Sequence, residues 1–403
     1  MMPRLPGPPP AAAMRPELEL IACFLRPPTS AGSEDHIHSL LQGHLNWDDV
    51  MAIATRHKVQ PIVWERLSGL DHVAIPAAAK EAFHQAARVA AASSLAQLQE
   101  LLRLCERFDA ERIPAIPYKG PVLSWLAYGS FTRRVYQDLD FVLPQRHIPA
   151  ATSLMQAAGY EPQFDPREAH AGGRKHAPGQ YSFFCGARNV LTELHTERTM
   201  RYFPIPPDLE DMHRRLIPVE VAGRTVRTFS IEDTLVLLAV HGGKHFWERL
   251  SWILDLAELI RTRSVDWPLA MRMAARAQCR RALLLGLCLA QEVLGATLPD
   301  SVREDIARDS NVRGLADIVH GELAGKTDPN AGILPRARFR LLSRDSFAQG
   351  IRHMLRLAVS PTETDRGSTH LPGPFYVFAR PWRLLREYGL GLRRRTKPGP
   401  PIL

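Results

Sequence analysis

The chain has 403 residues, of which 45% are hydrophobic and 23% are charged, and its formal net charge is +9. These values are typical of a globular protein with two or three domains and a sizeable core. The longest apolar stretch, residues 282–298, is interrupted by Gln291 and Glu292, which excludes a membrane-spanning helix and indicates a buried or amphipathic one.

The cysteines are odd in number, widely scattered and free of CxxC spacing, which argues against a disulfide framework and against a structural zinc site. They are Cys23, Cys105, Cys185, Cys279 and Cys288. This pattern fits a reducing cytoplasm. The positive charge fits polyanionic partners, but arginine enrichment also accompanies GC-rich coding, and both explanations stay open.

Five regions follow one another along the chain. Residues 1–16 form a proline-rich lead without a continuous apolar segment, which predicts disorder rather than a signal peptide. Residues 17–110 carry apolar side chains at spacings of three and four, which predicts a helical region. Residues 111–228 form a mixed core, residues 229–325 a second helical domain, and residues 326–403 a basic C-terminal region. No internal repeat is evident.

The mixed core begins with a short apolar strand at 113–118, followed by a helix that starts near Pro121. The strand "DLDFVL" comes next, and then a helix that ends at Gly159. The segments "GQYSFFC" and "NVLTELHTE", joined by "GAR", predict a hairpin that extends the same sheet. Ser230 is expected to cap the first helix of the next domain, with Asp233 three residues later. The chain is therefore predicted to be an α+β protein with a mixed sheet flanked by helical regions.

Two carboxylates lie one residue apart in the buried strand, at Asp138 and Asp140. Side chains of a strand alternate between its faces, so these two share one face while Leu139 points to the other. Buried acids are costly without partners, and oxygen ligands of this kind suit Mg²⁺. Two such ions can activate an attacking oxygen and stabilise a leaving pyrophosphate.

Glu193 is the candidate third carboxylate, with His195 on the same face of its strand. If the two strands are neighbours, the three acids converge, and their mutual repulsion predicts a bound cation.

These segments resemble a known family, the uncharacterised bacterial nucleotidyltransferases within the DNA polymerase β and kanamycin nucleotidyltransferase superfamily. The resemblance covers about residues 35 to 390. The resemblance lies in the order of "PYKGPVLSWLAYGSFTRRVYQDLDFVL", "LTELHT" and "HGGKHFWERLSWILDLAEL". The segments "LNWDDVMAIATRHKVQPIVWERL" and "PTETDRGSTHLPGPFYVFARPWRLL" also resemble the family's N-terminal helices and C-terminal end.

The resemblance implies a nucleotidyltransferase-type sheet and transfer of a nucleoside monophosphate from a nucleoside triphosphate to an unknown acceptor, with release of pyrophosphate. It implies that Asp138, Asp140 and Glu193 are catalytic residues and ligands of Mg²⁺, with Mn²⁺ as the alternative. Lys119 and Gly120 occupy the place of the superfamily's Gly-Ser turn, where a helix N-terminus would meet the triphosphate. The lysine, and the 17 residues between this glycine and the first aspartate, depart from the usual pattern.

Further basic residues are candidates for nucleotide binding. Arg133 or Arg134 either grips a phosphate or neutralises the acids. His195, His241 and Lys244 are assigned to the nucleotide cleft, with packing beneath it as the alternative for the last two. A metal site of His241, His245 and Glu248 is disfavoured because "HGGKH" lacks the glutamate of H-E-x-x-H. Trp252 and Asp255 are expected to fasten their helix to the mixed core.

Two other functions stay open. One is a catalytically silent nucleotide-binding or assembly protein on the same fold. The other is a nucleic-acid binder driven by charge. A lid role for residues 172–176 and a membrane or nucleic-acid contact through the basic residues 393–400 are both disfavoured against plain solvated segments.

Overall fold

The chain forms two compact units, Met1–Thr327 and Asp328–Leu403. The structure is a computed structural model, and it describes residues 15–27, 33–70, 75–164, 179–197, 203, 205, 208–325 and 334–359. The loop at 172–176 and the basic tail at 393–400 lie outside these residues. The five-part division expected from the sequence stays a prediction.

The first unit contains a five-stranded mixed sheet, which confirms the mixed sheet predicted from the sequence. Its strand order is β1-β2-β5-β4-β3, and only the β2–β5 pair is parallel. The strands β4 and β5 form the predicted hairpin. The strand bounds are β1 Ile116–Pro117, β2 Asp138–Val142, β3 Glu161–Pro162, β4 Gln180–Cys185 and β5 Val190–His195.

Leu139 and Phe141 of β2 lie on one face of the sheet, and both are fully buried. This face is therefore apolar. Phe108 of the long helix α5 packs edge-on against Phe141, with the ring centroids 5.3 Å apart. Burial of such side chains contributes roughly 1.5–3 kcal/mol each. The alternate residues Asp138 and Asp140 are thereby turned to the opposite face.

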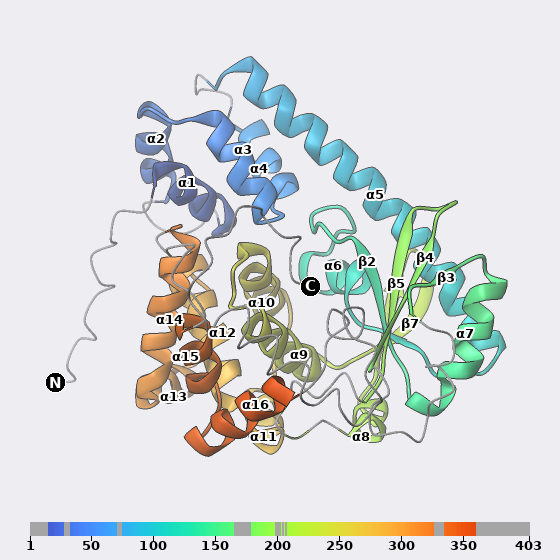
Figure 1. The fold of residues 1–403 in the computed structure, drawn as a ribbon. Coiled ribbons are helices and arrows are strands. Elements are labelled where there is room, and N and C mark those ends of the chain that lie inside the picture. The colour runs from blue at the N-terminus through green and yellow to red at the C-terminus, as the bar shows by residue number, and fades with distance from the viewer. Residues whose placement is uncertain are drawn as a thin grey trace, which may run out of the picture. The chain divides into compact units, whose positions relative to one another are not determined.

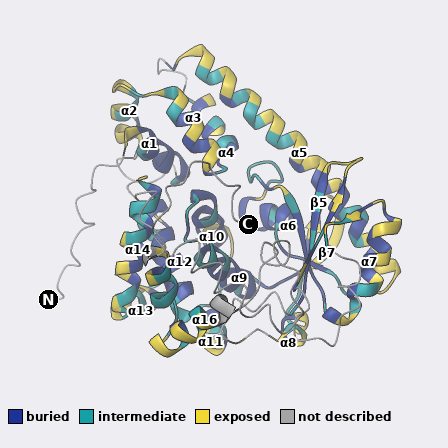
Figure 2. Ribbon diagram, viewed as in Figure 1, coloured by how far each residue is buried: buried dark blue, intermediate teal, exposed yellow. Residues whose placement is uncertain are grey.

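Helices surround the sheet, and α5 extends from the N-terminal helices to the strands (Figure 1). Burial is concentrated along α9 and α10, whereas much of the first half of α5 is exposed (Figure 2). In the first unit the bounds are α1 Pro16–Leu25, α2 Ser33–Gln42, α3 Trp47–Arg56, α4 Gln60–Ser68, α5 Ala77–Ala110, α6 Gly120–Tyr128, η1 Gln145–His147, α7 Ile148–Ala157, α8 Leu209–Arg214, α9 Ile231–Lys244, α10 Leu250–Thr262, α11 Trp267–Arg276, α12 Arg280–Leu294, α13 Asp300–Arg308 and α14 Ser310–Leu323.

A second hairpin was not expected from the sequence. Strands β6 (Ile217–Val221) and β7 (Arg224–Thr228) pair around Ala222 and Gly223, whose φ angles of 49° and 80° are those of a tight primed turn. The hairpin lies against the main sheet, because Thr228 Oγ1 donates to the carbonyl of Pro117 at 2.7 Å. The alternating residues at 217–228 were the available signal.

The helical hairpins α3–α4 and α11–α12 repeat one another, although no repeat is evident from the sequence. Lys58 and Gln278 occupy the same turn position with φ angles of 57° and 54°. Each turn closes with the same hydrogen bonds, which run from Val59 N–H to the Ala54 carbonyl (3.0 Å) and from Cys279 N–H to the Ala274 carbonyl (2.8 Å). Five positions of the repeat carry the same residue type, namely Trp47 and Trp267, Met51 and Met271, Ala54 and Ala274, Arg56 and Arg276, and Leu67 and Leu287.

Trp247 is fully buried after α9 and packs on two glycines. A Cβ added at Gly242 would lie 2.5 Å from the indole, and one at Gly286 would lie 2.8 Å from Leu256 and 2.9 Å from the indole. We expect Gly242→Ala to lower the free energy of unfolding by about 2 kcal/mol, because overpacking outweighs the helical preference of alanine.

Gly314→Ala is the matched control, since Gly314 lies in α14 and no atom lies within 4 Å of its added Cβ. This variant is expected to gain up to about 1 kcal/mol. Urea unfolding measures both. Equal stability of Gly242→Ala and the parent chain would contradict the packing seen around Trp247.

In the second unit, helices α15 (Leu334–Leu342) and α16 (Phe347–Val359) pack on each other. Among the described helices, none combines the length and the apolar character needed to cross a bilayer. The five cysteines are not joined in disulfides among the described residues. The predicted apolar segment at 282–298 is α12 and its C-terminal end, and α12 is largely buried.

Candidate active site

Strands β2 and β5 lie side by side, which confirms the condition for convergence of the acids. In their parallel register Asp140 is opposite Glu193, and Asp138 is opposite Leu191. Asp140 and Glu193 therefore share a sheet face and come from segments more than 50 residues apart in sequence.

Asp140, Glu193 and His195 form a compact group on this face. One ligand atom from each lies within 4.8 Å of the others. His195 Nε2 lies 2.8 Å from Asp140 Oδ1 and 3.3 Å from Glu193 Oε2. The side chains of Asp140 and His195 are 4% and 7% exposed, whereas that of Glu193 is 18% exposed. Only the glutamate is appreciably open to solvent.

The donor set of this group fits a divalent cation. Carboxylate oxygens suit Mg²⁺ and Mn²⁺, and an imidazole nitrogen suits Mn²⁺ and softer ions. His195 Nδ1 is buried and has no hydrogen-bond partner among the described residues, so the ring is not fixed from its far side. Sequence reasoning assigned His195 to the nucleotide. The structure places the ring between the two carboxylates, and the Glu-x-His alternation was the signal for this position.

Two cations stabilise the charge of Asp140. Lys119 Nζ lies 3.7 Å from Asp140 Oδ1, and the Lys119 side chain is only 14% exposed. Burial alone would raise the pKa of Asp140, but Lys119 and His195 outweigh burial and hold this pKa below its ordinary value. The acids likewise hold the pKa of His195 above its ordinary value despite burial.

Asp138 lies beside the group of three rather than within it. Burial and the neighbouring Asp140 raise the pKa of Asp138 to about 6, and Glu193 adds to the effect. The carboxylates therefore repel one another in the absence of a cation, which is the repulsion that the sequence predicts.

The N-terminus of α6 approaches the acids through Gly120. Its φ is 51°, and an added Cβ would lie 3.3 Å from the carbonyl oxygen of Asp138, so only glycine suits this position. The turn offers fewer N–H groups to a phosphate than expected. Pro121 has none, and the N–H groups of Val122 and Leu123 both donate to the carbonyl of Lys119.

The two arginines before the aspartates form ion pairs elsewhere. Arg134 donates to both oxygens of Asp255, at 2.8 and 3.0 Å, and Tyr128 donates to the same carboxylate at 2.8 Å. Asp255 thus fastens α10 to the mixed core, as predicted. Arg133 pairs with Glu65 at 2.8 Å. A phosphate-binding role for either arginine stays a prediction.

The rings at the end of α9 pack together. His241 and His245 lie with their centroids 4.8 Å apart, and Trp252 lies 5.5 and 5.1 Å from them. Burial and the positive charge of Lys119 lower the pKa of His241 well below its ordinary value. The assignment of His241 and Lys244 to the nucleotide stays a prediction.

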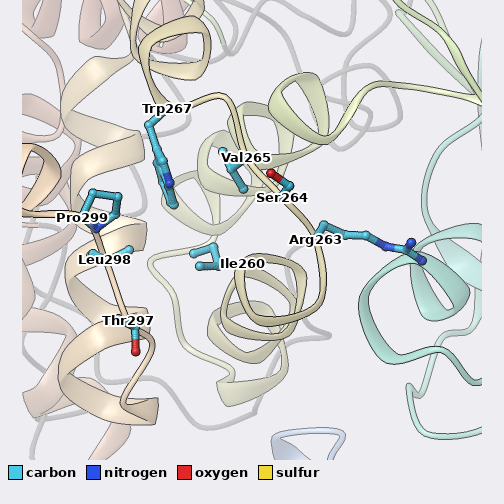
Figure 3. Close-up of a pocket in the computed structure, with 8 residues that line it drawn as sticks. All are labelled: Ile260, Arg263, Ser264, Val265, Trp267, Thr297, Leu298 and Pro299. Carbon is cyan, nitrogen blue, oxygen red and sulfur yellow. The ribbon is translucent and has the colours of Figure 1, made fainter.

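Two surface pockets stand out in the described chain, and neither is lined by the acids. The larger, of about 410 Å³, lies where α10 ends and α11 begins (Figure 3). The other, of about 280 Å³, lies between α4 and α5. The larger pocket is lined by Ile260, Arg263, Ser264, Val265, Trp267, Thr297, Leu298 and Pro299. Chemistry therefore indicates the acidic group as the site, although neither of these hollows contains it.

No curated protein matches the chain. A crystal structure of an antigenic nucleotidyltransferase-like protein from Paracoccidioides brasiliensis is similar at 16% identity and a TM-score of 0.35, over 51% of this chain and 94% of that one. Residues 43–295 match the family described as "Uncharacterised nucleotidyltransferase". Since this match spans more than half of the 403 residues, the chain belongs to that family of uncharacterised nucleotidyltransferases.

Proposed function

We propose that the protein is a metal-dependent nucleotidyltransferase of the DNA polymerase β and kanamycin nucleotidyltransferase superfamily. It moves a nucleoside monophosphate from a nucleoside triphosphate to an acceptor that is still to be identified. The observation that carries the proposal is the group of Asp140, Glu193 and His195 on adjacent parallel strands, in a chain of this family. The free thiols support a reducing compartment such as the cytoplasm.

Asp140 and Glu193, with Asp138 beside them, would hold Mg²⁺ or Mn²⁺ in this site. Such an ion supplies charge stabilisation for the phosphates and for the leaving pyrophosphate. The His195 side chain would have to move for the ion to bind both carboxylates, because its Nε2 lies within 3.3 Å of an oxygen of each.

The residues of this chain divide the remaining work. Glu193 is the most exposed of the three and is the base that accepts the proton of the acceptor hydroxyl. The acceptor oxygen forms its bond to the α-phosphorus, and the bond from that phosphorus to pyrophosphate breaks. Lys119, held 3.7 Å from Asp140, neutralises negative charge at the α-phosphate.

A silent nucleotide-binding protein is the second candidate. The observation that favours it is the helix turn at Gly120, where Pro121 and the bonded N–H groups of Val122 and Leu123 leave few donors for a phosphate. Such a protein would bind a triphosphate without turning it over.

The test is an incubation with each of the four α-labelled nucleoside triphosphates, Mg²⁺ and separated small-molecule, RNA and protein fractions. Release of pyrophosphate together with label on one fraction, both abolished by EDTA, supports the transferase. Triphosphate binding without label transfer supports the silent protein. Transfer that persists in EDTA would contradict a metal-dependent mechanism.

A further inference from the structure

The turn between α3 and α4 carries Lys58 to the edge of the acidic site. Lys58 Nζ donates to Oε1 of Gln137 at 2.8 Å, and Gln137 is the residue before Asp138. The turn is fixed in place, because His57 is 1% exposed and its Nδ1 accepts the backbone N–H of Leu250 at 3.1 Å. The N-terminal helices therefore present a rigidly placed amine beside the sheet.

Arg249, the residue before α10, is the second cation at this place. Its guanidinium stacks over Trp252, 5.2 Å from the ring centroid. Burial and the nearby Arg249 lower the pKa of Lys58 to about 8, while Asp138 opposes the change. The two cations are the sequence neighbours of His57 and Leu250, which are hydrogen-bonded to each other, so both lie at the same place. One is hydrogen-bonded to an amide and the other is stacked on a ring.

Neither cation forms an ion pair with a carboxylate among the residues that the structure describes. This distinguishes them from their neighbours, since Arg133 pairs with Glu65 and Arg134 pairs with Asp255. Repulsion between unpaired cations is unfavourable, and a bound anion removes it. Lys58 contacts the residue before Asp138, so an anion bound by these cations would lie beside the acidic site.

We infer that Lys58 and Arg249 form a phosphate-binding subsite for the triphosphate chain whose reacting end lies at Asp140 and Glu193. This inference rests on the proposed function. It makes the N-terminal helical region part of the active site rather than a separate appendage, because α3 and α4 supply one of the two cations. The ligand class is a polyphosphate, and the base is not read by these side chains.

Lys58→Gly is the decisive variant, because glycine relieves the positive φ of 57° while it removes the amine. Gln278→Gly is the matched control, since it relieves the same strain, at φ 54°, in the repeated hairpin α11–α12. Neither change is expected to lower the melting temperature. Lys58→Arg keeps the charge and is expected to restore binding.

The measurement is calorimetric titration with magnesium tripolyphosphate, which has no base. We expect Lys58→Gly to bind about tenfold more weakly than the parent chain and Gln278→Gly to bind equally well. The loss is expected to shrink at high salt, because dissolved ions screen the attraction between the ammonium group and the phosphates. Equal binding by Lys58→Gly, or no binding by the parent chain, would overturn the subsite.

The outcome is separable from that of the proposed function. If label transfer is seen but Lys58→Gly binds tripolyphosphate normally, the transferase function is supported and the subsite is excluded. An anionic acceptor then becomes the expected ligand of these cations. If tripolyphosphate binding depends on Lys58 but no transfer is seen, the subsite stands on a silent protein.

Discussion

Replacing Asp140 by asparagine is expected to slow pyrophosphate release by about a thousandfold, or about 4 kcal/mol of transition-state stabilisation. Asp140 is the acid with the most partners, since it contacts both His195 and Lys119. Asparagine keeps the shape of the side chain but removes the negative charge. The cation site then loses a ligand, and two positive groups lose their shared counter-charge.

The measurement is the initial rate of pyrophosphate release, together with calorimetric titration of Mg²⁺ into the free protein. Asp35→Asn is the control, because Asp35 is an exposed carboxylate of α2. It is expected to leave both readouts unchanged. An Asp140→Asn protein that folds, binds Mg²⁺ as before and keeps its rate within tenfold would exclude the acidic group as the active site.

The strand carrying the aspartates could be predicted because its information is local. Side chains alternate between the two faces of a strand, so Asp138 and Asp140 share one face and Leu139 and Phe141 share the other. The structure confirms this arrangement. The same alternation, with Gly-containing turns, gave the hairpin of β4 and β5. The same alternation is present in β6 and β7 at residues 217–228, although this hairpin was not predicted.

The surroundings of the acids could not be predicted, because they depend on contacts between distant segments. Lys58 reaches Gln137 across 79 residues, and His57 meets Leu250 across 193. No periodicity in one sequence encodes such pairs. The alternation predicts the face on which His195 lies, but its contact with Asp140 joins residues 55 positions apart in the sequence. Sequence spacing specifies a face, and tertiary packing then specifies the partner.

Arginine roles were the least predictable part of the site. A guanidinium near two aspartates suits both a phosphate and a carboxylate, so the sequence left both open. The guanidinium of Arg134 donates two hydrogen bonds to Asp255, 121 residues away. Tyr128 donates a hydrogen bond to the same carboxylate. Asp255 was expected to fasten α10 to the mixed core, and its contacts with Arg134 and Tyr128 confirm this.

Replacing Asp138 by asparagine is expected to stabilise the metal-free protein at pH 8 while it impairs the reaction. The pKa of Asp138 is raised to about 6, from an ordinary value of 3.8, by burial and by Asp140. The folded state therefore binds a proton more tightly than the unfolded state does. The contribution of Asp138 to stability is complete below pH 3.8 and is lost as the pH rises through 6. The loss amounts to at most about 3 kcal/mol.

The difference in the free energy of unfolding between Asp138→Asn and the parent chain should consequently be small near pH 4 and increase towards pH 8. Urea unfolding in EDTA at both pH values measures it, with Asp35→Asn as a variant that should show no such difference. Saturating Mg²⁺ should reduce this stability difference, because the ion offsets the repulsion between the carboxylates. The ion also stabilises the parent chain by binding to its folded state. A variant that is less stable than the parent chain at pH 8 would show that Asp138 is a structural ion-pair partner. In that case its burial beside Asp140 would serve the fold rather than the binding of a cation.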